Sequence, residues 1–379
     1  MKKLSLVLLS AFLWSAQSTF AQAKQKVQVK INKNVEFLGF CYFIGFGGEG
    51  IETKEVVREG KKMLEKDWHR YGYKFYKKYR PYTKSKHFVK AMTAAQHLWL
   101  SHHIYLLLQV DDFPKAKLPV GMDVEVYLSF SKKKDPADAK RVTQIFLEEM
   151  NAFYKEVDFD QYLRDSKKYY EVALAEVKQY LPKPAVIAQM ERFYKKSFDA
   201  YVLVPSLTIP QSMGFGPRIT QNGKSTAFNV FGGLTHQQVD DSKPLKMGFD
   251  DPTQMRELAV HEFGHSFVNP VVAQLPQSAF AKTEHLYPPL KKAMIKQNYT
   301  NWKGCVYEHF VRAGEIMIAR LMNDQAATQR LHQDYVQNRQ FVHIDLILAE
   351  LTKYHQGKNG TYAETIAKAM AKMAKVKAK

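Results

Sequence analysis

Cysteine is scarce in this sequence, where Cys41 and Cys305 are the only two among 379 residues. No CxxC pair exists, which disfavours a zinc site built from thiolates. In an oxidising compartment the two cysteines can form one disulfide. Two buried free thiols are the equal alternative, because spacing along the chain does not show whether the side chains meet.

Long apolar runs are also missing. Beyond the N-terminus no segment is apolar for long enough to cross a bilayer, so we expect no transmembrane segment. Residues 1–21 are typical of a secretory signal peptide: Lys2-Lys3 precede an apolar run from Leu4 to Ala16, and small residues end at Ala21 or Ala23. We therefore expect an exported protein, in the periplasm or outside the cell.

Acidic residues are outnumbered, with 37 Asp and Glu against 56 Lys and Arg and a formal net charge of +19. Such an excess favours anionic surroundings, which makes contact with an anionic envelope surface an expectation. The densest basic stretch, 58–90, also contains many aromatic residues, a composition that can stack nucleic acid. In an exported protein an amphipathic helix with a solvated lysine-rich face explains it better, so we expect no nucleic-acid partner.

The sequence HEFGH at 261–265 is the pattern that carries chemistry. On a helix, His261 and His265 lie on one face about a turn apart, so both imidazoles can reach one metal ion. Glu262 lies one step round the helix, where its carboxylate can take a proton from a water that the ion activates. The motif predicts one catalytic Zn²⁺ per chain and the chemistry of a zinc metallopeptidase.

The residues around the motif predict a helix with defined ends. Asp251-Pro252 is an N-cap followed by proline at the first helical position, and Gln254 completes a capping box. Apolar residues follow at helical spacing, and Asn269-Pro270 should end the helix one turn after His265, because proline cannot continue it. The alternative interpretation is a buried amphipathic helix whose two histidines are satisfied by hydrogen bonds.

A catalytic zinc site needs a third protein ligand. The histidine and glycine that metzincins place after their motif are absent, since Val271 and Val268 occupy those positions. A gluzincin instead takes a glutamate from a later helix, and the segment 304–324 is predicted to be one.

Glu308 and Glu315 both lie on that predicted helix, about 10 Å apart along its axis, so only one of them can bind the ion. We expect the ligand to be Glu308, which lies nearer the helix start. Arg312 and Glu315 can then pair one turn further on, which offsets the unfavourable placement of an arginine close to a dication. Glu315 would lie on a solvated charged stripe or orient a ligand.

HEFGHSFVNP (261–270), followed some forty residues later by YEHFVRAGE (307–315), resembles a family of secreted bacterial proteins of uncharacterised function with a gluzincin-like active site. The segment 33–48 is similar to the opening segment of that family. The resemblance implies a zincin-like catalytic core and peptidase activity.

By the same resemblance His261, His265 and Glu308 are the metal ligands and Glu262 is the base. One departure is visible, because the thermolysin-like pattern has Asn-Glu and then an acidic residue four places on. Here Tyr307 precedes Glu308 and Arg312 follows it, so thermolysin-type interactions around the ligands are not expected.

A peptidase also needs a hydrogen-bond donor for the oxyanion that forms during amide hydrolysis. The sequence does not choose among the candidates downstream of the active helix: Tyr307, His309, His285, Tyr287 and Tyr299. Arg312 and Glu315 are further candidates for a supporting role. Asn269 can orient the imidazole of His265, although its place at the expected helix end explains it equally well. Glu257, a turn before His261, has the same ambiguity.

The expected fold class is α+β and mainly helical, with a zincin-like core, short antiparallel edge strands and an N-terminal helical region. We expect that helical region at 22–200, the catalytic region at 201–355 and a basic Ala/Lys-rich tail at 356–379. Strands at 201–207 and 228–231 would border the cleft, where an extended substrate adds as a further strand; plain core strands are the alternative. Other expected elements are a strand pair within 27–48, a strand at 124–130 and a cleft-shaping loop at 270–300 with a short helix near its end.

Together these patterns predict an exported zinc-dependent metallopeptidase that acts on peptide or protein substrates. Two alternatives stay open. One is a zinc-binding protein without turnover whose basic helical part binds the envelope or polyanions, and the other is a zinc hydrolase of a non-peptide amide such as a cell-wall crosslink. The intact Glu262 argues against the first, since a site that only holds metal does not need a base. Substrate preference and oligomeric state do not follow from the sequence.

Overall fold

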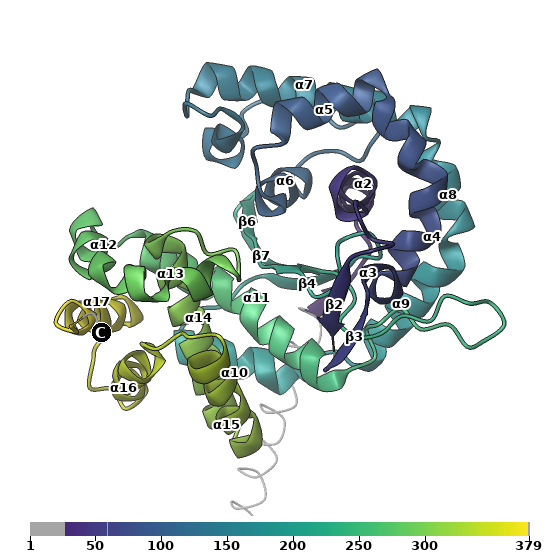
Figure 1. Ribbon diagram of the computed structural model, residues 1–379. Helices are drawn as coiled ribbons and strands as arrows, with labels where there is room; N and C mark the ends of the chain where they lie inside the picture. Colours follow the sequence, from purple (N-terminus) through teal and green to yellow (C-terminus); the bar gives the residue numbers. More distant parts are fainter. Residues whose placement is uncertain (1–26, 59, 378–379) are drawn as a thin grey trace, which may run out of the picture.

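The computed structural model describes residues 27–58 and 60–377, which form a mainly helical α+β fold. Figure 1 shows two lobes with a sheet and a long helix between them: the larger lobe comes from roughly the first half of the chain and the smaller one from its C-terminal part. The predicted signal peptide lies outside the described residues. Within them, no helix combines the length and apolar character that a membrane span requires.

The N-terminal lobe is helical apart from one short strand and one hairpin. In chain order its elements are β1 (Val27–Val29), α2 (Lys33–Tyr42), η1 (Phe43–Gly47), β2 (Glu55–Arg58), β3 (Lys61–Leu64), α3 (Glu65–Trp68), α4 (Arg70–Tyr79), η2 (Arg80–Lys84), α5 (Lys86–Ala95), α6 (Leu100–Leu107), η3 (Val124–Val126), η4 (Leu128–Phe130), α7 (Pro136–Glu156), α8 (Phe159–Asp165) and α9 (Lys167–Gln179). The next helix, α10 (Pro184–Tyr194), packs against helices of the second half of the chain and lies beside the C-terminal lobe (Figure 1).

Two strand predictions in this lobe are wrong. The segment 27–48 contains one strand, and its apolar remainder is the buried helix α2, which begins where the Asn32 side chain accepts a hydrogen bond from the backbone N–H of Val35. The segment 124–130 consists of two 3₁₀ turns. There the Asp123 carboxylate accepts from the backbone N–H of Glu125, a local contact that favours a turn over a strand.

Most aromatic residues of the basic stretch 58–90 face the interior, and Tyr82 is exposed. Tyr71, Phe75 and Tyr79 of α4 are buried, and Phe75 packs against Phe40 of α2 with ring centroids 5.2 Å apart. The lysines of α4 lie on its outer face. Helix α4 is therefore amphipathic, as expected for part of this stretch.

The central sheet is mixed, with strand order β1-β4-β7-β5 and with β6 also paired to β7. Its later strands are β4 (Ala200–Pro205), β5 (Gly214–Phe215), β6 (Arg218–Gln221) and β7 (Lys224–Phe231). The strands predicted at 201–207 and 228–231 exist, but the edge position expected for them is wrong. The expected antiparallel pairing is wrong for the first strand and confirmed for the second, which pairs antiparallel with β5 and β6. They form β4 and β7, which pair in parallel with Val202 opposite Phe228. Continuous apolar runs of this kind are typical of strands buried on both faces.

The long helix α11 (Pro252–Ala273) follows the sheet and leads into the C-terminal lobe (Figure 1). The expected stop at Asn269-Pro270 is wrong, since the helix continues through Pro270 to Ala273. Proline removes only one N–H from the backbone ladder here, and burial of Val268 and Val272 stabilises the last turns. The lobe then contains α12 (Gln277–Thr283), η5 (Glu284–Leu286), α13 (Tyr287–Ile295), α14 (Trp302–Leu321), α15 (Gln325–Gln333), η6 (Asp334–Asn338), α16 (Ile344–His355) and α17 (Tyr362–Met373).

The loop expected at 270–300 is also wrong, because most of that segment is helical. Pro276 precedes α12, and Pro288 and Pro289 lie in the first turn of α13, where proline is compatible with a helix because no backbone N–H is needed. In the basic tail, α17 buries Ile366 and Met370 against the lobe, so this segment is part of the fold.

Cys41 and Cys305 are both free and buried. The structure therefore has two buried free thiols and not the disulfide that was the other alternative.

One buried carboxyl group connects the N-terminal lobe to the sheet. Glu36 of α2 is fully buried, and its Oε2 accepts hydrogen bonds from the hydroxyls of Tyr170 (2.8 Å) and Thr208 (3.2 Å) and from the backbone N–H of Leu207 (3.3 Å). Its Oε1 has no hydrogen-bond partner among the described residues. Burial raises the pKa of Glu36 to about 7, against the opposing effect of these hydrogen bonds.

We expect Glu36→Gln to remove a pH-dependent loss of stability. The unfolded carboxyl releases its proton near pH 4.5 and the folded one near pH 7, so the free energy of unfolding falls as the pH rises through this window. Above this pH window the free energy of unfolding is lower by about 3 kcal/mol, because each pKa unit corresponds to about 1.4 kcal/mol. Urea unfolding at pH 5 and pH 8 should show the variant gaining stability relative to wild type at the higher pH.

Glu350→Gln is the matched control. Burial alone would raise the pKa of Glu350, but its contacts with Lys353, Lys372 and Asn359 lower that pKa to about 2. Its carboxyl is therefore ionised in both states from pH 5 to pH 8, and the effect of the substitution should be the same at both values. The same pH-independent difference for Glu36→Gln would contradict the prediction.

Candidate metal centre

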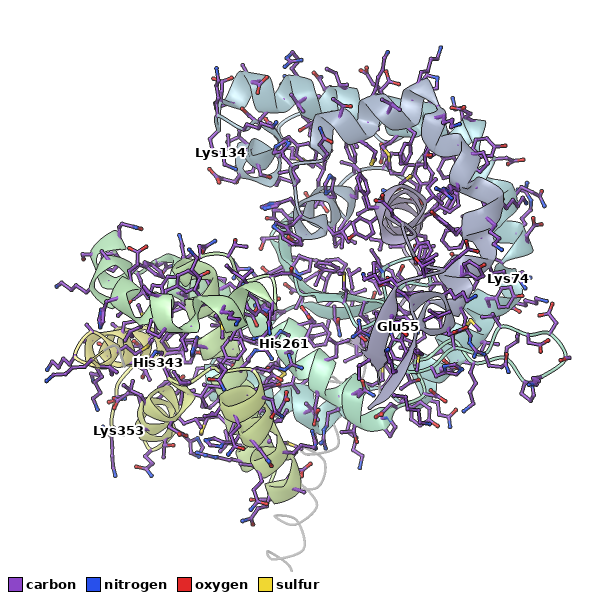
Figure 2. All side chains as sticks on the ribbon, in the orientation of Figure 1. Glu55, Lys74, Lys134, His261, His343 and Lys353 are labelled. Carbon is purple, nitrogen blue, oxygen red and sulfur yellow. The ribbon has the colours of Figure 1, made fainter. Side chains whose placement is uncertain are left out.

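The helix α11 presents the two histidines of the motif to the junction of the lobes. Asp251 caps its start as predicted, accepting from the backbone N–H groups of Thr253 and Gln254. One side of the helix is buried against the sheet and α14. His261 and His265 project from the same face one turn apart, and Figure 2 shows His261 where the two lobes meet.

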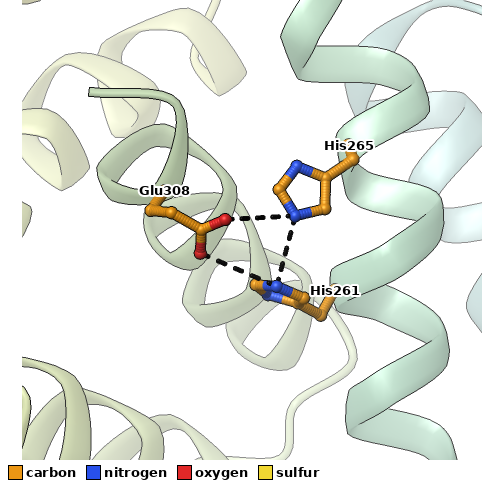
Figure 3. A group of neighbouring side chains, drawn as sticks. All are labelled: His261, His265 and Glu308. Carbon is orange, nitrogen blue, oxygen red and sulfur yellow. Dashed lines mark hydrogen bonds and ion pairs between the residues drawn. The ribbon is translucent and has the colours of Figure 1, made fainter. Parts of the chain in front are cut away.

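Glu308 of α14 reaches this pair from the C-terminal lobe (Figure 3). Its carboxylate oxygens lie 3.7 Å from His261 Nε2 and 3.4 Å from His265 Nε2, and the two Nε2 atoms are 3.3 Å apart. Ligand atoms bound at 2.0–2.1 Å in tetrahedral geometry lie about 3.3 Å from one another. The three side chains are therefore grouped as a metal ion requires.

The other ring nitrogens show which atoms carry hydrogens. His261 Nδ1 lies 2.6 Å from the Glu315 carboxylate, and His265 Nδ1 lies 3.2 Å from Asn269 Oδ1. Both partners are acceptors, so both Nδ1 atoms donate and both Nε2 lone pairs face Glu308. Two lone pairs directed at a carboxylate repel, and Glu308 Oε2 is buried without a hydrogen bond. A cation bound among these atoms would remove the repulsion, and neutral imidazoles with a carboxylate are a donor set that suits zinc.

Glu315, the alternative ligand in the sequence, lies behind His261 and not in the cluster. One of its oxygens accepts from His261 and the other from the Tyr335 hydroxyl at 2.7 Å. Burial raises the pKa of Glu315 to about 7, although Arg312 and Tyr335 act in the opposite direction. Glu315 therefore orients an imidazole, the supporting role that carboxylates commonly have behind metal-binding histidines.

The expected ion pair between Arg312 and Glu315 is wrong. Arg312 Nη2 lies 3.1 Å from Glu308 Oε2, one helical turn away, and also donates to the Tyr299 hydroxyl at 3.2 Å. The guanidinium carbon is 4.7 Å from the ring centroids of both Tyr335 and Phe341. The positive charge thus faces the ligand carboxylate, because Glu315 is turned toward His261 instead.

The charges around Glu308 keep it ionised. Burial alone would raise its pKa, but His265 and His261 in their protonated forms, together with Arg312 and a hydrogen bond from Tyr299, lower the pKa of Glu308 to about 2. A carboxylate that stays charged at neutral pH is ready to bind a cation without first losing a proton.

Glu262 lines the same cleft and is 5 % exposed. Burial, followed by the repulsion of Glu308 and Glu315, raises the pKa of Glu262 well above its usual value. The strand β5 passes directly over this residue: a Cβ at Gly214 would overlap the Glu262 carboxylate, and one at Gly216 would overlap the Glu262 carbonyl. Glycine at both positions allows this close approach.

The cluster opens into a cleft of about 1650 Å³ between the lobes. The end of α2, the turn η1 and the segment from the end of α5 into α6 form its N-terminal wall, and α14, α15 and η6 form the opposite wall. The edge strand β5 borders the cleft next to Glu262.

Of the five side chains predicted as oxyanion donors, one lines the cleft and four do not. Tyr299 lines the cleft, whereas Tyr307, His309, His285 and Tyr287 are absent from its lining. Tyr307 and His309 flank Glu308 on one helix, so each points about 100° away from it. His309 is fully buried, with Nδ1 2.7 Å from the Cys305 carbonyl.

The two remaining candidates make structural contacts. His285 Nε2 lies 2.8 Å from the Val376 carbonyl, and the Tyr287 hydroxyl donates to the Tyr299 carbonyl. Glu257 lines the cleft but pairs with the Arg330 guanidinium through both oxygens.

Sequence reasoning missed Tyr335 and the glycines of β5. The GFG sequence at 214–216 was the available signal, since two glycines around one residue are typical of close backbone contact. Tyr335 has no local signal, because its partner Glu315 lies 20 positions earlier and on another helix.

We expect zinc affinity to separate the ligands from the residue that orients them. Glu308→Ala should abolish stoichiometric binding, because it removes a ligand. Glu315→Ala should weaken binding by about 10–100-fold, because His261 loses the partner that fixes its tautomer. Glu257→Ala, a glutamate on α11 outside the cluster, is the control and should bind as wild type does. Competition with a chromophoric chelator measures all four proteins; full affinity in Glu308→Ala would contradict the ligand assignment.

Comparison with known proteins gives a family without an assigned activity. No curated protein and no solved structure matches the chain. A family model described as "Domain of unknown function (DUF4932)" matches residues 28–367, a range that runs from β1 into α17 and includes both helices of the cluster. The chain therefore belongs to the DUF4932 family.

Proposed function

We propose that this protein is an exported zinc-dependent peptidase of the gluzincin type. The observation that carries the proposal is the grouping of His261, His265 and Glu308 at tetrahedral ligand spacing with Glu262 beside them in a cleft. A site that only stored or sensed a metal would need the three ligands. It would not need a glutamate next to them with glycines at 214 and 216 packed against it.

The chain's own residues supply the proton transfers. When bound, zinc would act as a Lewis acid toward the scissile carbonyl and make water more acidic. Glu262 accepts the proton of the attacking water and then gives it to the leaving nitrogen. Burial and the neighbouring carboxylates raise the pKa of Glu262, so this carboxylate accepts a proton more readily than an exposed one.

The cleft also offers groups for binding an extended chain. The strand β5 is an edge of the sheet, paired only with β7, and it lines the cleft beside Glu262. Free backbone groups on such an edge can pair with a substrate in extended conformation. This supports a peptide substrate, on β5 and not on the strands that the sequence suggested.

Tyr299 is the donor that we propose for the oxyanion. Of the candidates named from the sequence, its side chain is the one that borders the cleft. Its hydroxyl accepts a hydrogen bond from Arg312 and also hydrogen-bonds the Glu308 carboxylate, so its O–H lies beside the cluster and would turn from Glu308 to the oxyanion. A positioned donor of this kind is worth roughly 100–1000-fold in turnover.

The decisive experiment compares Glu262→Gln with wild type after loading with zinc. Because glutamine cannot take a proton, we expect hydrolysis to fall by about 100-fold or more while zinc content stays at one per chain. Cleavage of a mixed peptide library, followed by mass spectrometry, measures the activity. Glu257→Gln is the control on the same helix and should retain full turnover.

Murein fragments belong in the same assay, because a non-peptide amide is the competing substrate class. Cleavage of murein without cleavage of peptides would replace the peptidase assignment by that alternative. Failure of zinc-loaded wild type on both substrates would leave a metal-binding protein without turnover.

A further inference from the structure

We propose that the N-terminal wall of the cleft binds uncharged, apolar stretches of polypeptide, and that Trp99 and Phe46 contact the large side chains of the substrate. This inference rests on the proposed function, because it assigns a substrate class to the same cleft.

The first observation is the exposure of these two aromatic side chains. Among the described residues three Phe, Tyr or Trp side chains are more than one-third exposed: Trp99 at 56 %, Phe46 at 45 % and Tyr82 at 37 %. Trp99 and Phe46 both line the cleft, and Tyr82 does not. Aromatic side chains gain free energy when a partner covers them, so two of them at one cleft indicate a contact surface.

The second observation is the backbone that presents them. Phe46 lies in η1, a π-helical turn, and its ring centroid is 6.0 Å from that of Tyr42, which also lines the cleft. Trp99 is the residue before the first turn of α6. A second π-helical turn, η6, borders the opposite wall with Tyr335. Such turns are rare and occur frequently at functional sites.

The third observation is the distribution of charge. The charged groups that line the cleft are five carboxylates and three guanidinium groups, all from residue 257 onward, with no lysine. The N-terminal wall contributes neither a carboxylate nor a lysine or arginine. The chain as a whole has a formal net charge of +19, so its basic surface lies elsewhere.

The three arginines of the cleft are already paired. Arg312 contacts Glu308, Arg330 contacts Glu257 and Arg339 contacts Asp334. An acidic substrate would find no unpaired cation in this lining, and burying its charges against aromatic rings would be unfavourable. An uncharged, apolar segment fits the N-terminal wall, while its backbone can pair with β5.

The test measures peptide binding to the full chain carrying Glu262→Gln, which prevents turnover, with zinc bound. The probe is an end-blocked, fluorescein-labelled decapeptide containing Phe and Leu, and two matched peptides replace those residues by Ser or by Glu. Anisotropy should show the Phe/Leu peptide binding at least tenfold tighter than either. Adding Trp99→Ala or Phe46→Ala should weaken it by about tenfold.

Tyr82→Ala is the matched control, an exposed aromatic outside the cleft, and should bind within twofold of the parent. Because Trp99 and Phe46 are exposed, circular dichroism should show an unchanged fold for their variants. Equal binding by Trp99→Ala, Phe46→Ala and Tyr82→Ala, preference for the Glu peptide, or no binding of the Phe/Leu peptide would each overturn the inference.

The two proposals fail in different ways. If the cleft binds the Phe/Leu peptide through Trp99 and Phe46 but the intact chain does not hydrolyse it, the peptidase assignment fails and the binding site stands. If the intact chain cleaves peptides with a KM that neither substitution changes, the peptidase stands and this substrate class is wrong.

Discussion

Two carboxylates of α14, Glu308 and Glu315, are buried against α11, and the geometry of the site depends on how their charge is compensated. An unpaired buried carboxylate is unfavourable by several kcal/mol. Arg312 lies beside Glu308, while His261 and Tyr335 hydrogen-bond the two oxygens of Glu315. These contacts also fix the site. Arg312 holds the Glu308 carboxylate beside the two histidines, and Glu315 sets the tautomer of His261.

This compensation requires the two helices to lie close together. Gly264, inside the HEFGH motif, faces α14, and a Cβ there would sit 3.4 Å from Val311 Cγ1. The C-terminal lobe supplies α16, which packs against α14, and η6, which brings Tyr335 to Glu315. The lobe therefore supports the face of α14 that carries Glu308, and the N-terminal lobe supplies the wall opposite the cluster.

The elements that the sequence predicted best are those with strong local signals. The N-terminal cap of α11 and the helix predicted at 304–324 agree with the structure, as do the positions of β4 and β7. The wrong predictions of helix ends and loops came from using proline alone as the sign that a helix stops. Pro270 does not end α11 because buried neighbours stabilise its last turns, and the later prolines Pro276, Pro288 and Pro289 lie where helices begin. Edge and centre positions in the sheet were not distinguishable, because strand order depends on contacts between residues more than 100 positions apart.

The sequence by itself determined that His261 and His265 share one helical face with Glu262 next to them, because the 3.6-residue period of a helix requires it. It also limited the candidates for a third ligand to two glutamates of one later helix. Only the tertiary structure distinguishes them, by placing Glu308 at the histidine Nε2 atoms and Glu315 at Nδ1 of His261. The approach of β5 to Glu262 and the pairing of Arg312 were decided in the same way, because a helical period sets the direction of a side chain but not what packs against it.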